Sequence, residues 1–379
     1  QAFTSSGGVA QVDNGPTINF FNLDTDGVGG PNSGINLDGQ GGDDSFALTH
    51  AENWLVGVVA VFGGAPSGSD SVQISGTAAV DDVTYTANSA NSGQLVVTSG
   101  GSPTVYELID VESASVDAHD PTAIPGDTLD VTTPNATIAP GAAPGSGTVY
   151  PVAFSGQALL PLSYGGMESV VITGSTAVVV GTTGDDDVHV TDAGLVRVTD
   201  HFGNVNEFDV SAFTRLVVNT LGGDDAITID ANDALFANGI RVLGGDPSGS
   251  DTLTLTDNPG LADLFSVTMA LSAGSGAVTR NVVDIAYVGI EQVVLVASGD
   301  TGDSLTVQHD DTDRIWNVTG APGGRDRVQI DGRETIDFEA FDSVELTNNV
   351  GGPNNDTFRV FPSNLGNFNV FTVTGDGVG

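Results

Sequence analysis

The hydrophobic residues fall in short runs in which apolar and polar positions alternate, the pattern of half-buried β-strands. Valine, leucine, isoleucine and phenylalanine fill the apolar positions, and threonine often lies between them. The best candidate for a helix, Ala51 to Phe62, contains Gly57 followed by valines, so a strand explains it at least as well. The pattern therefore predicts an all-β protein.

A long internal repeat organises these runs. Residues 63–70, Gly-Gly-Ala-Pro-Ser-Gly-Ser-Asp, return at 244–251 as Gly-Gly-Asp-Pro-Ser-Gly-Ser-Asp, an offset of 181 (251 minus 70). Residues 41–44, Gly-Gly-Asp-Asp, return at 222–225 with the same offset. Later matches drift by a few residues, as loop insertions would produce: 126–129 with 302–305, and 168–170 with 342–344.

The repeat predicts the division of the chain. Residues 35–215 form copy 1, residues 216–379 form copy 2, and residues 1–34 are the end of a preceding copy. Asp26-Gly27-Val28-Gly29 matches Asp376-Gly377-Val378-Gly379, so copy 2 ends in the middle of the repeat. We therefore expect that the natural chain continues or that a neighbouring molecule completes it.

Within a copy, strands alternate with sharp turns, as in Leu216–Val218, Gly222–Asp225 and Ile227–Ile229. Strands of this length, with roughly 20 to 30 residues per cycle, favour a parallel β-solenoid (β-helix) built from two divergent copies. Tandem β-sandwich domains are the alternative, but they need many hairpins. Only Val328–Ile336 is a strong hairpin signal. The proline-rich stretch 117–151 is expected to be an extended excursion from the solenoid.

The charge is strongly one-sided. Formal net charge is −40, from 49 acidic and 9 basic residues, and the first basic residue is Arg197. All nine basic residues are arginine. Nucleic-acid binding is therefore not expected, because it depends on basic side chains that displace counterions. The lack of lysine also excludes a P-loop and Schiff-base chemistry.

The chain has no cysteine, which excludes disulfides and thiolate metal sites. No apolar run approaches the roughly 18 residues of a membrane span, so membrane insertion is not expected. Gln1 suits a mature terminus left by signal-peptide cleavage. We expect an extracellular or cell-surface protein, of bacterial origin.

Two glycine-aspartate turns resemble the hemolysin-type (RTX) calcium-binding repeats, whose pattern is Gly-Gly-x-Gly-x-Asp-x-apolar-x. They are Gly41-Gly42-Asp43-Asp44-Ser45-Phe46-Ala47-Leu48 and Gly222-Gly223-Asp224-Asp225-Ala226-Ile227-Thr228-Ile229. In that family the nonapeptides follow one another directly and enclose calcium, whereas each turn here stands alone. The closer resemblance is to giant bacterial extracellular proteins built from degenerate β-solenoid repeats.

The resemblance implies calcium as a cofactor, and calcium takes six to eight oxygens from carboxylates and carbonyls. The candidate metal ligands are the aspartates of the acidic turns: Asp43, Asp44, Asp185, Asp186, Asp187, Asp224, Asp225, Asp300, Asp303, Asp310, Asp311 and Asp313. The alternative is structural, since glycine permits positive φ and aspartate caps turns with its own side chain.

We expect no enzyme. Paired carboxylates are too abundant to indicate a glycosidase, and no Gly-x-Ser-x-Gly elbow is present. The sequence instead predicts a structural protein that assembles end to end with copies of itself into a filament or surface array, stabilised by calcium. One alternative is a cell-surface adhesin or spacer rod that contacts polysaccharide. Another is a β-helix polysaccharide lyase or hydrolase using Arg241, Arg314 or Arg325.

Overall fold

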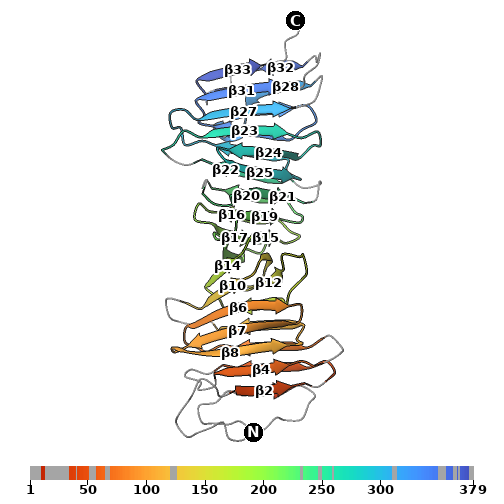
Figure 1. Ribbon diagram of the computed structural model, residues 1–379. Helices are drawn as coiled ribbons and strands as arrows, with labels where there is room; N and C mark the ends of the chain where they lie inside the picture. Colours follow the sequence, from red (N-terminus) through yellow and green to blue (C-terminus); the bar gives the residue numbers. More distant parts are fainter. Residues whose placement is uncertain are drawn as a thin grey trace. The chain divides into compact units, whose positions relative to one another are not determined.

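The computed structural model describes residues 10–12, 34–39, 41–50, 57–64, 69–119, 126–230, 234–245, 250–257, 260–309, 314–348, 356–361, 365 and 368–374. Across these ranges the regular structure consists of β-strands and one 3₁₀ turn, η1 (Pro322–Gly324), with no α-helix (Figure 1). The all-β prediction is confirmed. Val58–Phe62, in the segment weighed as a helix, is a strand.

The chain divides into two compact units. Unit 1 comprises residues 1–177 and 204–212, and unit 2 comprises residues 178–203 and 213–379. Strand β15 (Thr176–Val180) crosses the boundary. Each unit is built from long sheets rich in parallel neighbours, an arrangement that antiparallel sandwich domains lack.

In unit 1 the chain passes repeatedly between two sheets, although some successive strands, such as β6 to β8, stay in the same sheet. One sheet has the order β1-β3-β5-β9-β13-β12-β11, and the other has β2-β4-β8-β7-β6-β10-β14-β18. The strands are β1 (Ala10–Val12), β2 (Gly34–Asp38), β3 (Ser45–Thr49), β4 (Val58–Phe62), β5 (Ser71–Ser75), β6 (Asp81–Ser89), β7 (Ser92–Ser99), β8 (Ser102–Ile109), β9 (Ser113–Asp117), β10 (Thr128–Thr132), β11 (Asn135–Pro140), β12 (Gly147–Val152), β13 (Leu162–Gly165), β14 (Ser169–Thr173) and β18 (Val205–Asp209).

In unit 2 the chain passes between two sheets in the same way. Its sheets have the orders β19-β21-β25-β24-β23-β27-β31-β33 and β17-β16-β20-β22-β26-β30-β29-β28-β32. The strands are β16 (Asp187–Val190), β17 (Leu195–Thr199), β19 (Arg215–Asn219), β20 (Ala226–Ile229), β21 (Ile240–Leu243), β22 (Thr252–Thr256), β23 (Leu264–Met269), β24 (Ser275–Arg280), β25 (Val283–Val288), β26 (Gln292–Val296), β27 (Ser304–His309), β28 (Ile315–Gly320), β29 (Asp326–Ile330), β30 (Thr335–Glu339), β31 (Ser343–Asn348), β32 (Thr357–Val360) and β33 (Val370–Thr374).

Antiparallel meanders of three strands interrupt the parallel ladders in both units. They are β6–β8 and β11–β13 in unit 1, and β23–β25 and β28–β30 in unit 2. The hairpin predicted at Val328–Ile336 is confirmed as β29 and β30. A second signal was missed: Gly100 and Gly101, both at positive φ, form the two-residue loop between β7 and β8.

The proline-rich stretch contributes strands to both sheets of unit 1. Its described residues include β10, whose neighbours β6 and β14 are both parallel to it, and β11 and most of β12, which pair antiparallel. Its prolines are tolerated because Pro140 and Pro151 lie at or near strand ends. Much of the stretch is therefore sheet and not an extended loop.

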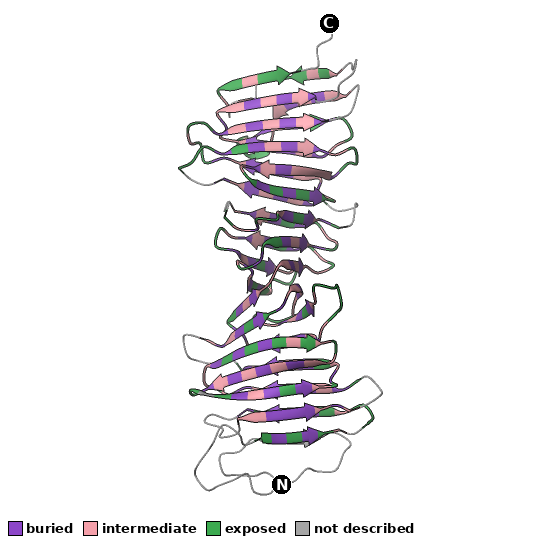
Figure 2. Ribbon diagram, in the orientation of Figure 1, coloured by how far each residue is buried: buried purple, intermediate pink, exposed green. Residues whose placement is uncertain are grey.

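Burial follows the alternation predicted from the sequence. Along β22, β27 and β31 every second side chain is buried, and the same purple bands cross most strands in Figure 2. The buried positions are dominated by valine, leucine and isoleucine, such as Leu255, Val307 and Leu346. Branched side chains pack well on a pleated surface, so the core lies between the two sheets that the chain visits in turn.

Candidate functional site

An acidic residue lies at the start of most parallel strands. Asp44, Asp70 and Glu112 directly precede β3, β5 and β9, which are neighbours in one sheet. We call twelve acids at these starts the inner acid row, of which all but the exposed Glu168 are buried or half-buried: Asp44, Asp70, Glu112, Asp81, Asp127, Glu168, Asp186, Asp225, Asp251, Glu291, Asp263 and Asp303.

Inner-row carboxylates bind backbone amides of the neighbouring strand level. In unit 1 the Asp44 N–H donates to Asp70 Oδ1 at 2.7 Å, and the Asp70 N–H donates to Glu112 Oε2 at 2.8 Å. The other sheet repeats this arrangement: the Asp81 N–H donates to Asp127 Oδ1 at 2.7 Å, and the Asp127 N–H donates to Glu168 Oε2 at 2.6 Å. Each carboxylate thus satisfies a donor that the turn would leave unpaired.

Unit 2 has the longest such series. The Asp186 N–H donates to Asp225 Oδ1 at 2.8 Å, the Asp225 N–H to Asp251 Oδ1 at 2.9 Å, and the Asp251 N–H to Glu291 Oε2 at 2.9 Å. In its other sheet the Asp263 N–H donates to Asp303 Oδ1 at 3.0 Å. The carboxylates therefore act as an interstrand hydrogen-bond ladder.

Glycine makes the room that this ladder needs. At Gly63 a side-chain carbon would collide with the carbonyl oxygen of Asp110 and lie 2.6 Å from Asp70 Oδ2. At Gly244, 181 residues later, it would collide with the carbonyl oxygen of Gly289 and lie 2.6 Å from Asp251 Oδ2. The most similar segments of the two copies thus keep the same packing constraint.

The second carboxylate oxygen of several inner-row aspartates is buried without a hydrogen-bond partner among the described residues. This holds for Oδ2 of Asp44, Asp70, Asp127, Asp225, Asp251 and Asp303. Burial raises the pKa of Asp127 and of Asp251 to about 6, helped by neighbouring carboxylates and opposed by the amide hydrogen bonds. Burial also raises the pKa of Asp186 and of Asp225.

A second, exposed row runs beside the first. The Asp224 N–H donates to Asp185 Oδ1 at 2.9 Å, and the Ser250 N–H donates to Asp224 Oδ1 at 3.0 Å. We call Asp185 and Asp224 the outer acid pair; both are exposed and directly precede inner-row residues. In the outer bonds the donor N–H belongs to the later strand level and the acceptor to the earlier one, whereas the inner bonds have the opposite direction. Neighbouring turns are therefore hydrogen-bonded in both directions.

The predicted metal ligands thus separate into several groups. Asp44, Asp186, Asp225 and Asp303 belong to the inner row, whereas Asp43, Asp185, Asp187 and Asp224 are exposed. Asp300 accepts hydrogen bonds from Ser298 Oγ at 2.6 Å and from the Gly260 N–H, which lower the pKa of Asp300. Asp310, Asp311 and Asp313 lie outside the described residues.

Nine of the twelve predicted metal ligands lie within the part of the chain that the structure describes. No group of three or more histidine, aspartate or glutamate side chains there is arranged to hold a metal ion. Among the inner-row aspartates, Asp225 Oδ1 and Asp251 Oδ1 accept backbone amides, and Asp251 Oδ2 is enclosed beside Gly244.

Sequence reasoning overlooked most of the inner row. Asp70, Asp81, Asp127, Asp251 and Asp263 were not among the predicted sites, because they do not belong to the paired aspartates beside glycine that resemble calcium-binding turns. Their signal was a single acid directly before an alternating apolar run, as in Asp127-Thr128-Leu129 and Glu168-Ser169-Val170. The position of that acid directly before the strand recurs more regularly along the chain than the glycine motif does.

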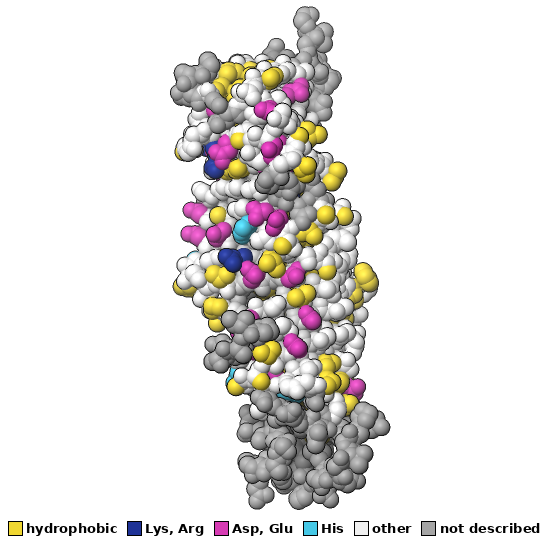
Figure 3. All heavy atoms as spheres, turned by 90° about the vertical axis from the view of Figure 1, so that its left-hand side faces the viewer, with side chains coloured by type: hydrophobic (Ala, Val, Ile, Leu, Met, Phe, Trp, Pro, Cys, Tyr) yellow, Lys and Arg dark blue, Asp and Glu magenta, His cyan; other side chains and the backbone are white. Residues whose placement is uncertain are grey.

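Acidic side chains are spread over the face shown in Figure 3, and arginines are few among them. The described residues contain no helix of the length and hydropathy needed to cross a membrane. No protein-family model, curated protein or solved structure matches this chain.

Proposed function

We propose that the protein is an extracellular structural protein. Each of its two units consists of successive coils of a β-solenoid, and separate molecules join end to end. The repeated passage of the chain between two sheets supports the solenoid, because each parallel neighbour comes from the next pass of the chain. The inner acid row supports it too, since these carboxylates repeat at successive passes.

The observation that carries the assembly proposal is the exposure of β32 and β33. Val360 and Val373 occupy inward positions, in register with Val318 and Leu346, which are both 0% exposed. Yet Val360 is 38% exposed and Val373 is 41% exposed. In the described residues β33 pairs only with β31, and an unpaired strand edge accepts a further strand, whether from the same chain or from a second molecule.

Electron microscopy and sedimentation of the full chain test this proposal. We expect filaments that lengthen with protein concentration, and we expect Val373→Lys to give monomers because it places a charge in the joint. Leu264→Lys, at another exposed apolar position, is the matched control and should still assemble. Monomers of uniform length at every concentration would contradict assembly and leave a spacer rod as the better explanation.

Calcium is proposed here only as a surface ligand. Exposed carboxylates such as Asp43, Asp185 and Asp224, on a chain of net charge −40, attract divalent cations that reduce repulsion between neighbouring turns. Thermal unfolding with calcium and then with excess chelator tests this idea. We expect the chelator to lower the melting temperature; an unchanged temperature would refute calcium binding without touching the assembly proposal.

The proposed extracellular location and the resemblance to bacterial repeat proteins are based on the sequence. The lack of cysteine, the excess of acid and the degenerate glycine-aspartate turns are typical of large exported bacterial repeat proteins. Secretion of the intact gene product by a bacterial host into the medium or onto the cell surface is the expected result. Retention in the cytoplasm would contradict the extracellular role.

A further inference from the structure

A shallow depression on the outer face of unit 2 combines arginine with small side chains. Nine of its ten lining residues come from five neighbouring strands, β19, β21, β25, β24 and β23, and the tenth, Ala270, directly follows β23. Neighbouring strands lie roughly 4.8 Å apart, so the track crosses roughly 19 Å of sheet. Its length and direction suit an extended polymer lying across the strands.

The register places one row of outward side chains along this track. Arg241 lies opposite Ala286, Ala286 opposite Ala277, and Ala277 opposite Thr268. Ser275 lies beside this row on β24. The floor of the track is therefore lined by small side chains, two of which carry hydroxyl groups. This row has no large apolar side chain of the kind that dominates protein–protein interfaces.

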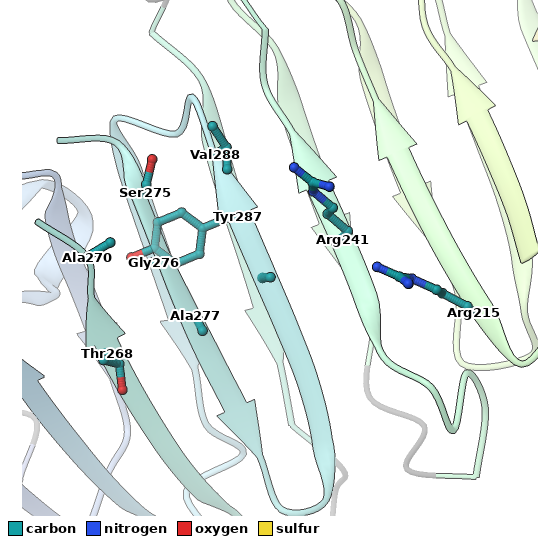
Figure 4. A pocket seen from close by; sticks show the side chains of 10 residues that line it. Arg215, Arg241, Thr268, Ala270, Ser275, Gly276, Ala277, Tyr287 and Val288 are labelled. Carbon is teal, nitrogen blue, oxygen red and sulfur yellow. The ribbon is translucent and has the colours of Figure 1, made fainter. Parts of the chain in front are cut away.

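Two guanidinium groups stand at one end of the track. Both arginines are exposed; Arg241 extends toward the strand that carries Tyr287 and Val288, and Arg215 extends toward the strand that carries Arg241 (Figure 4). Among the described residues neither arginine has a hydrogen bond or an ion pair. Asp284, on the adjacent strand, accepts a hydrogen bond from Thr279 Oγ1 at 2.9 Å.

The presence of two neighbouring arginines is unusual for the composition of the chain. Acidic residues outnumber basic ones by 49 to 9, yet the lining contains two arginines and no carboxylate. Arginine presents a planar fork of donors that matches carboxylate and sulfate groups, and unpaired arginine has no internal partner to give up on binding. The charge, the hydroxyl groups and the open shape are complementary to an acidic glycan.

We propose that this track binds an acidic polysaccharide, with Arg215 and Arg241 pairing with its uronate carboxylates and Thr268 and Ser275 contacting its hydroxyl groups. The proposal is independent of end-to-end assembly, because the track lies on the outer face of β19 to β25 and not at β32 or β33. It would give the structural protein a means of holding a surface or matrix polymer.

Isothermal titration of the full chain with oligogalacturonate tests the proposal. Arg241→Gln should weaken binding about tenfold, and the double variant Arg215→Gln/Arg241→Gln should abolish it, since each charge-assisted pair is lost. Arg359→Gln, which removes an exposed arginine outside the track, is the matched control and should bind as the parent does. A neutral galactose oligomer of the same length should not bind.

A second variant keeps the test independent of lost charge. Ala286→Glu places a carboxylate in register with Arg241 and should block oligogalacturonate, whereas Ala286→Gln should bind nearly normally. A sulfated oligosaccharide distinguishes carboxylate from general anion recognition: binding equal to that of the uronate would overturn the uronate assignment. Failure of the parent to bind uronate, equal weakening by Arg359→Gln, or arginine-dependent self-association without glycan binding would overturn the proposal.

Discussion

The inner acid row and the outer acid pair contain the same chemical group, one residue apart in sequence, in opposite surroundings. Asp225 is 1% exposed and Asp224 is exposed, although both carboxylates accept a backbone N–H from a neighbouring strand level. The inner carboxylate has a raised pKa, whereas the outer one keeps contact with water. Strand alternation alone decides which acid is enclosed.

Removing the carboxylate should change the free energy of unfolding by different amounts at the two positions. Removing a buried acceptor leaves a buried donor unsatisfied, which costs about 1–3 kcal/mol and more where charge is involved. An exposed hydrogen bond is easily replaced by water, so its removal costs little. The Gly-Asp-Asp turn therefore contains one buried acid that stabilises the fold and one surface acid that contributes little to stability.

The largest loss of stability is expected from replacing a glycine that makes space for an inner-row carboxylate. Gly63→Ala should destabilise unit 1 by about 3 kcal/mol, because the new carbon collides with the Asp110 carbonyl and crowds Asp70. Gly165→Ala is the control, since its nearest neighbour would be Asp117 Oδ1 at 3.9 Å. Denaturant unfolding measures both; equal losses would mean that backbone flexibility, and not space for the carboxylate, explains the glycine.

The next effect compares the two rows directly. Asp225→Ala should cost about 2 kcal/mol, because the buried Asp186 N–H loses its acceptor, whereas Asp224→Ala should cost about 0.5 kcal/mol. Asp225→Asn keeps an amide oxygen for the Asp186 N–H and should recover part of the loss. If Asp224→Ala proves as damaging as Asp225→Ala, the distinction between the rows is wrong.

The pH dependence should reveal the enclosed carboxylates. The folded pKa of Asp127 and of Asp251 is about 6, above the unfolded value of about 3.9, so the folded state binds protons more readily between these values. The stability they contribute is fully present below about pH 4 and is lost as pH rises through about 6. Thermal unfolding should therefore show a melting temperature that falls from about pH 4 to about pH 6 and then levels off.

Variants separate this contribution from the net charge of the whole chain. Asp127→Asn and Asp251→Asn should each flatten the fall in melting temperature between about pH 4 and about pH 6. Asp130→Asn, an exposed position on β10, should leave the slope unchanged. His50 works in the opposite direction, because burial lowers its pKa and charging it on acidification destabilises the fold. A slope insensitive to Asp127→Asn would show that this carboxyl titrates normally.

The strands and their buried faces were predictable because period-two alternation directly reports which side chains face a core, as in Ile227 and Ile229 of β20. The repeat offset located matching turns such as Gly63 and Gly244. The meanders were harder to foresee, since β6 to β8 differ from ladder strands only in length and in the Gly100-Gly101 loop.

The acid ladder escaped prediction for a different reason. Asp44 and Asp70 are 26 residues apart and meet only because their strands are neighbours, and no local pattern states that contact. The paired arginines depend likewise on strand order and not on sequence spacing. Local chemistry identified which residues bear charge, but sheet register decides which of them become partners.

The smallest effect concerns the outer acid pair. Asp185→Asn/Asp224→Asn keeps an oxygen for each backbone donor but removes repulsion between exposed charges, so stability should rise by about 0.5 kcal/mol at low salt. Because the Debye length falls to about 3 Å at 1 M salt, this gain should vanish there. Asp225→Asn should show little salt dependence, since its site excludes ions. Calcium should likewise stabilise the parent more than the outer-pair variant, and an equal response would place the cation elsewhere on the surface.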